Sequence, residues 1–202
     1  MCSAKRIVAF LVLLVLPGFS GPSVAQDPRT SPERAVHFVQ EFGGRVVAVL
    51  ARTDTTDGQL RQQIEGIIRD SVDVEAIGRS SLGSAWQRAS DAQRRDYQEL
   101  FGLWATRTYA ERLGANRGGS LTVLGALATA SDAYVRAKVA RADGRASVID
   151  LRVREAQGRM KIVDAEVDGI SMDVTQRDEF ASVIRRQGLD ALIDSLRTQA
   201  AN

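Results

Sequence analysis

The chain has little of the side-chain chemistry that most catalytic and metal-binding sites need. Its 202 residues include one cysteine, Cys2, and one histidine, His37. A single cysteine excludes an intramolecular disulfide and any metal site built from several thiolates. A Ser-His-Asp triad would have to use His37, and no EF-hand spacing of acidic residues occurs. We therefore predict no catalytic residues, no metal site and no cofactor, and expect that the protein is not an enzyme.

The sequence also lacks an apolar run long enough to span a bilayer, which takes about 20 residues. The longest run, residues 7–16, follows Lys5 and Arg6 and precedes small residues at Ser23 and Ala25. This order of features is typical of a secretory signal peptide. We predict cleavage after Ala25 and a periplasmic mature protein.

Residues 1–25 are then a signal peptide, and residues 26–202 form a single domain. The 27 basic residues lose Lys5 and Arg6 with the signal peptide, which leaves 25 against 25 acidic residues. A formally neutral chain has no basic excess for nucleic acid, so we predict no nucleic-acid partner. An exported protein without disulfides fits a bacterial periplasm, where disulfides are permitted but not required.

Helical patterns fill the first part of the mature chain, residues 31–114. Apolar residues recur there at steps of three and four, the period of amphipathic helices. Ser90-Asp91-Ala92-Gln93 is a capping box, and it predicts a long helix to about Leu113 that Gly114 ends. Asp73 is expected to begin a short helix through Ile77, and the stretch from Ser80 to Ser84 to break it.

The period then changes to alternation over residues 120–168. We predict four strands, at about 120–129, 133–142, 146–155 and 159–168. Asp143-Gly144 predicts a type I′ hairpin, and Gln157-Gly158 a second turn. Two helices follow within residues 175–199. Helices before and after an antiparallel meander indicate an α+β fold, a four-stranded sheet with helices covering one face.

Three segments together resemble a known family. They are VDVEAIGRSSLGSAWQRASDAQRRDYQELFGLWATRTYAERL at residues 72–113, MKIVDAEVDGISMDVTQRDEF at 160–180 and RRQGLDALIDSLRTQ at 185–199. In order and spacing they are similar to the MlaC-type periplasmic phospholipid-binding proteins, also called toluene-tolerance auxiliary proteins. The hopanoid-associated HpnM branch looks like a close relative. Residues 160–164 lack the aromatic side chain that the family often has before the strand-end Asp, which leaves the hopanoid branch open.

The resemblance implies an NTF2-like sheet under a helical cover, with a deep apolar pocket between them. It also implies a shuttle that carries phospholipid between an outer-membrane lipoprotein complex and an inner-membrane ABC transporter complex, in the maintenance of lipid asymmetry. We expect a monomer. Three alternatives stay open: a hopanoid carrier of the same fold, a non-catalytic interaction module of the envelope, and an enzyme on this scaffold that uses His37 or a buried carboxylate.

Apolar residues on facing elements are the candidates for the pocket wall. They are Tyr109, Val135, Val139, Leu151, Val153, Val167, Ile170, Met172 and Ile184. Apolar positions at a regular period are core by default, so each is also a core candidate. Acyl chains gain roughly 0.8 kcal/mol per buried methylene, so a lipid pocket needs no charged cluster. Asp164 and Asp168 are expected to serve turns and local hydrogen bonds rather than catalysis.

Overall fold

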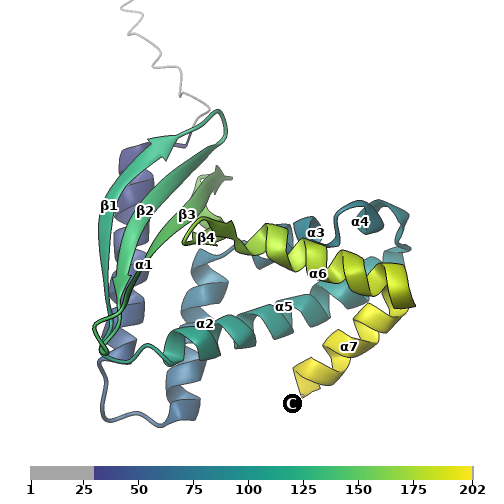
Figure 1. Ribbon diagram of the computed structural model, residues 1–202, viewed down its shortest axis with the longest axis horizontal. Coiled ribbons are helices and arrows are strands. Elements are labelled where there is room, and N and C mark those ends of the chain that lie inside the picture. The colour runs from purple at the N-terminus through teal and green to yellow at the C-terminus, as the bar shows by residue number, and fades with distance from the viewer. Residues whose placement is uncertain (1–29, 202) are drawn as a thin grey trace, which may run out of the picture.

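The computed structural model describes residues 30–201 (Figure 1). The predicted signal peptide and its cleavage site after Ala25 lie outside the described residues. The helices are α1 (Pro32–Leu50), α2 (Asp57–Ser71), α3 (Val74–Leu82), α4 (Ser84–Arg88), α5 (Asp91–Gly114), α6 (Met172–Gln187) and α7 (Leu189–Ala201). The strands are β1 (Ser120–Ala128), β2 (Asp132–Ala140), β3 (Ala146–Ala156), β4 (Arg159–Val167) and β5 (Ile170–Ser171).

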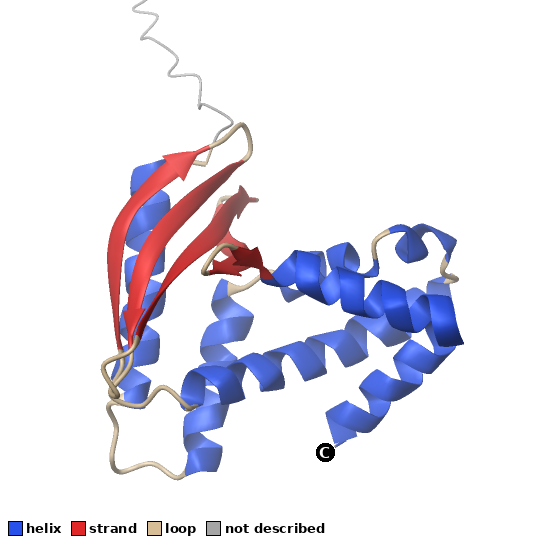
Figure 2. Ribbon diagram, viewed as in Figure 1, coloured by secondary structure: helices blue, strands red, loops and turns tan. Residues whose placement is uncertain are grey.

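The strands form one antiparallel sheet in the order β1-β2-β3-β4-β5. The predicted α+β architecture is confirmed, and the short β5 adds a fifth strand to the four expected. Helix α1 lies along one face of the sheet, while α5, α6 and α7 form a separate helical layer beside it (Figure 2). Alternation gives the sheet an apolar face toward α1 and a charged face, on which Arg136 donates to Asp150 across β2 and β3 at 2.8 and 2.7 Å.

Two of the turns have positive φ at both central residues, as a type I′ turn requires. They are Gln157-Gly158 (53° and 73°) and Asp168-Gly169 (50° and 84°). The type I′ prediction at Asp143-Gly144 is wrong, because only Gly144 has positive φ there. Its N–H donates to Arg141 O at 3.1 Å, and the Asp143 carboxylate accepts from Arg145 N at 3.0 Å, so the loop is one residue longer.

Local hydrogen bonds fix most helix ends as expected. The Ser90–Gln93 capping box is present, and its hydrogen bonds measure 3.0 and 3.2 Å. The predicted break at Ser80–Ser84 is wrong in extent, because α3 continues through Leu82, with the Ser81 hydroxyl donating to Ile77 O. The break falls at Gly83, whose φ of 53° favours glycine.

Buried side chains form three clusters. A sheet cluster lies between α1 and β2–β4, and consists of Ala35, Val39, Ala133, Val135, Leu151, Val153 and Ile162. A corner cluster joins α1, α2 and α5 through Val46, Leu50, Leu60, Ile64, Ile67, Ile68 and Ala110. A bundle cluster joins α3, α5, α6 and α7 through Leu82, Tyr97, Phe101, Ala105, Phe180, Leu192, Ile193 and Leu196.

At Gly78, α3 lies directly against α5. A methyl group there would lie 2.7 Å from Phe101 Cδ1 and against Gln98 Oε1, and the Tyr97 hydroxyl donates to Gly78 O at 2.9 Å. Gly78→Ala should therefore lower the free energy of unfolding by about 1–2 kcal/mol, since overpacking outweighs the gain in helix propensity.

The matched control is Gly102→Ala in α5, where a methyl group would meet nothing within 4 Å. It should raise stability by up to about 1 kcal/mol. Urea unfolding curves of both variants measure the difference. Equal effects from the two substitutions would contradict the close approach of α3 to α5.

Candidate functional site

The three clusters meet along a line of partly buried apolar side chains. Phe42 and Val72 pack against both the sheet and the corner clusters, and Val74 and Tyr109 against both the corner and the bundle clusters. We call these four residues the apolar seam. Each is partly exposed to solvent although it contacts two cores. The seam therefore lies at the borders between the clusters and stays partly accessible to solvent.

The sheet contributes further apolar side chains on the same side. Ile149 and Ala165 are partly buried and pack against the sheet cluster. Val167, the register partner of Ile149 on β4, is also partly buried. The apolar sheet face around Ile149 and Val167 is thus not fully covered by α1. The same face is fully covered at Val135.

The structure divides the predicted wall residues into two groups. Val135, Leu151 and Val153 are enclosed in the sheet cluster with exposures of 0, 5 and 0%. The others are partly or largely exposed: Tyr109, Val139, Val167, Met172 and Ile184 are partly buried, and Ile170 is 60% exposed. Tyr109 and Ile184 each pack against the bundle cluster. Ligand contact at these positions stays a prediction, and the partly exposed group is better placed for it.

Of the four seam residues, only Tyr109 has a polar side-chain group. The Arg112 guanidinium lies 5.6 Å from its ring centre. Burial raises the pKa of the Tyr109 hydroxyl, Arg112 lowers it, and the carboxylates of Asp164 and Asp173 raise it further. The hydroxyl is therefore protonated at neutral pH. Within residues 30–201 it makes no hydrogen bond, so it can donate one to a ligand.

Asp164 joins the sheet to the start of α6. Its Oδ1 accepts from Ala165 N at 2.8 Å and Asp173 N at 3.1 Å, and its Oδ2 accepts from the Ser171 hydroxyl at 2.7 Å. Ser171 is itself the N-cap of α6. This carboxylate therefore has all of its hydrogen bonds within the fold, as the sequence-based interpretation expected.

The other acid–base candidates are also accounted for by structural contacts. Asp168 Oδ1 accepts from Val148 N at 3.2 Å. His37 lies on the surface of α1, with Nδ1 3.6 Å from Glu41. Among the described residues, no group of three or more His, Cys, Asp or Glu side chains could hold a metal ion.

No helix within residues 30–201 is long and apolar enough to cross a membrane.

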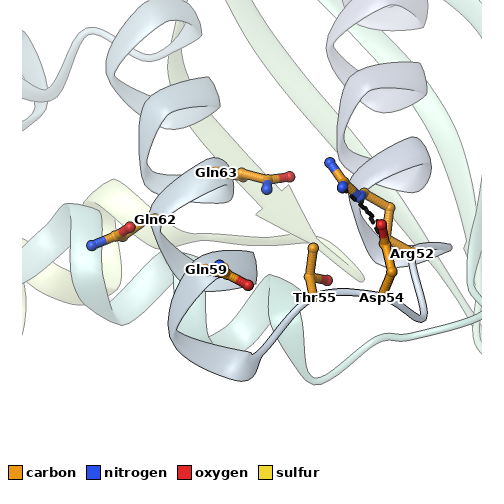
Figure 3. A pocket seen from close by; sticks show the side chains of 6 residues that line it. All are labelled: Arg52, Asp54, Thr55, Gln59, Gln62 and Gln63. Carbon is orange, nitrogen blue, oxygen red and sulfur yellow. Dashed lines mark hydrogen bonds and ion pairs between the residues drawn. The ribbon is translucent and has the colours of Figure 1, made fainter.

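A polar hollow of about 320 Å³ lies between the end of α1 and the start of α2 (Figure 3). It is lined by Arg52, Asp54, Thr55, Gln59, Gln62 and Gln63. Arg52 and Asp54, two residues apart on the loop after α1, form an ion pair at 3.1 Å. None of the predicted wall residues takes part, and every side chain of the lining ends in a polar group.

Some residues of the site were not on the predicted wall. Phe42 belongs to a series of apolar residues with helical period, so the sequence predicts that its side chain faces inward. The sequence does not predict that it lies between two clusters. Val72 and Val74 flank the Asp73 N-cap of α3, whose carboxylate accepts from Ala76 N at 2.9 Å. The backbone contact from Asp73 N to Ile162 O, at 2.9 Å, places them beside β4. No local pattern reports that long-range contact.

Comparisons with known proteins place the chain in a family and relate it to solved structures. The family model described as MlaC protein matches residues 33–198. A solved structure of a phospholipid-binding protein from Ralstonia solanacearum, in complex with a phospholipid, is similar with a TM-score of 0.71. The two sequences are 25% identical, and the match covers 83% of this chain and 97% of that one.

Proposed function

Because the chain belongs to the MlaC protein family, we propose that it binds phospholipid and carries it through the periplasm between the outer and inner membranes. The observation that carries the proposal is the apolar seam, where three cores meet without closing fully. The similarity to a phospholipid-bound relative over most of both chains supports it.

The seam offers an acyl chain the surface it needs. Roughly 0.8 kcal/mol is gained for each buried methylene, so two acyl chains supply a gross binding free energy of about 20 kcal/mol. Part of this offsets the separation of the layers that makes room for the chains. The Tyr109 hydroxyl, which has no acceptor within the described chain, donates to an ester or phosphate oxygen at the mouth. The charged head group stays in water and needs no dedicated cluster.

The family is a non-catalytic one, and this confirms the prediction that the protein is not an enzyme. Transfer of the lipid then breaks no covalent bond in it. Any ATP is hydrolysed by a partner protein. We propose the inner-membrane ABC transporter complex and an outer-membrane lipoprotein complex as the partners, with the carrier acting as a monomer. A periplasmic location is that of the MlaC family, and cleavage after Ala25 would release the carrier there.

A hopanoid carrier is the second candidate. The stretch from Met160 to Val163 holds no aromatic side chain, and Met160 packs against the sheet cluster. A flexible methionine adapts to a cargo of another shape more easily than a rigid aromatic ring. This difference favours a cargo other than phospholipid only if the cargo reaches that end of the sheet.

We expect the mature protein, purified from its own periplasm, to carry phospholipid at about one molecule per chain. Native mass spectrometry followed by lipid extraction measures both the ratio and the lipid class. His37→Ala should load to the same extent, because His37 lies on the surface away from the seam. A hopanoid in the extract would support the second candidate. A lipid-free mass that persists after incubation with liposomes would contradict both and favour an envelope interaction module.

A further inference from the structure

A second hollow, of about 640 Å³, lies where α3, α4 and α6 approach the end of β3. In Figure 1, α3 and α6 extend away from β4, and α4 lies beyond them. The lining consists of Asp73, Glu75, Ala76, Arg79, Ser80, Gly83, Trp86, Gln87, Arg154 and Arg177. Three arginines and two acidic residues are among them. Neither the apolar seam nor the carrier proposal uses this hollow.

Arg177 is the cation without a partner in this wall. A methyl group on Gly83 would lie 3.3 Å from its Cδ and 3.6 Å from its Cγ, so its stem rests on the turn that ends α3. It is partly buried, yet within residues 30–201 its guanidinium has no ion pair, hydrogen bond or ring contact. Arg95, Arg159 and Arg185 also lack such partners there, but all three are exposed to solvent. A guanidinium that faces a hollow without an anion keeps its N–H donors available to a bound anion.

The remaining charges of the wall are already paired. Arg79 donates to Glu75 at 2.8 Å, and its guanidinium lies 5.3 Å from the centre of the Trp86 ring. Arg154 makes a two-point contact with Asp132, at 2.6 and 2.9 Å. The Asp73 carboxylate caps α3, as described above. The cation left for a ligand is therefore Arg177, and Arg79 lines the same hollow.

We propose that this hollow binds a phosphate group, with Arg177 as its main ligand and Arg79 as the second cation. A guanidinium matches two phosphate oxygens with parallel N–H donors, which makes arginine the preferred residue for this anion. The Trp86 indole forms the apolar side of the hollow beside them. The phosphate can belong to a lipid head group or to a free ion. The proposal goes beyond the carrier function, because inorganic phosphate alone tests it.

Titration of the ¹⁵N-labelled mature protein with inorganic phosphate at low salt is the first experiment. We expect saturable shifts of the Arg177 side-chain N–H and the Trp86 indole N–H. Arg177→Gln should weaken the apparent affinity at least tenfold. Glu75→Gln should tighten it severalfold, because Arg79 is then released from its ion pair. The matched control is Arg185→Gln, on the exposed side of the same helix, and it should titrate as the unmodified protein does.

A second arm identifies the source of the phosphate. The protein is incubated with vesicles containing phosphatidylglycerol, or with vesicles in which diacylglycerol replaces part of that lipid. If the Arg177 and Trp86 signals shift in proportion to phosphatidylglycerol, the ligand is a head group. If only inorganic phosphate shifts them, the ligand is a free ion. No saturable response in either arm, or an equal response in Arg177→Gln, overturns the proposal. The lipid content of the purified protein is measured separately, so this failure is distinct from failure of the carrier function.

Discussion

Ile149→Glu is expected to lower phospholipid loading at least tenfold while the protein remains folded. Ile149 lies on the apolar face of β3, opposite Ala137 on β2 and Val167 on β4. It is only partly buried, so a carboxylate there can stay hydrated in the lipid-free protein. A bound acyl chain would strip that hydration from an unpaired charge, at a cost of several kcal/mol, where tenfold in affinity needs only about 1.4 kcal/mol. Quantitative lipid extraction after liposome incubation measures the loss.

The control for this variant is the neighbouring residue on the same strand. Val148→Glu makes the same chemical change on the opposite face of the sheet, at a side chain that is 40% exposed. It should load normally. If Ile149→Glu does not fold, Val167→Glu tests the same surface from the adjacent strand. Normal loading of a folded variant at either apolar position would show that this face of the sheet does not contact lipid.

Features that depend on neighbouring residues were predictable from the sequence. The Ser90–Gln93 capping box satisfies backbone groups within one helical turn, so four residues of sequence contain the whole signal. The strands likewise follow from alternation, because the side-chain period of a strand is two. The extent of α3 was missed for the opposite reason, since the Ser80 hydroxyl donates to Asp173, far along the chain, at 2.7 Å.

The division of the apolar face into core and seam was not predictable in this way. Val135 and Val139 lie on the same strand and the same face, yet Val135 is fully buried and Val139 only partly. The cause is the position of α1. The Thr30 hydroxyl, just before α1, donates to Ser131 O at 3.0 Å, so the helix begins beside the start of β2. Further along, Gly43 of α1 lies against the Leu121 side chain of β1. Alternation reports which face a residue is on, but not where a helix crosses that face.

Asp164→Ala is expected to lower the free energy of unfolding by about 3 kcal/mol, because it leaves two backbone N–H groups and the Ser171 hydroxyl without their acceptor. Hydrogen bonds to a charged acceptor are about twice as strong as neutral ones, and these three hold β4, β5 and α6 together. The free energy of unfolding of Asp164→Asn should lie between those of the unmodified protein and Asp164→Ala, since an amide keeps one acceptor oxygen. Urea unfolding monitored by circular dichroism measures both variants.

The matched control is Asp178→Ala on the exposed side of α6, where the carboxylate makes no hydrogen bond within residues 30–201. Its effect should stay within about 0.5 kcal/mol, as for most surface substitutions. A loss at Asp164 no larger than this would show that the start of α6 is held by packing alone. A large loss carries a further consequence, because α6 bears both Ile184 of the predicted wall and Arg177 of the phosphate hollow. Loosening its first turn should then weaken lipid loading and the phosphate response together, through one helix that belongs to both sites.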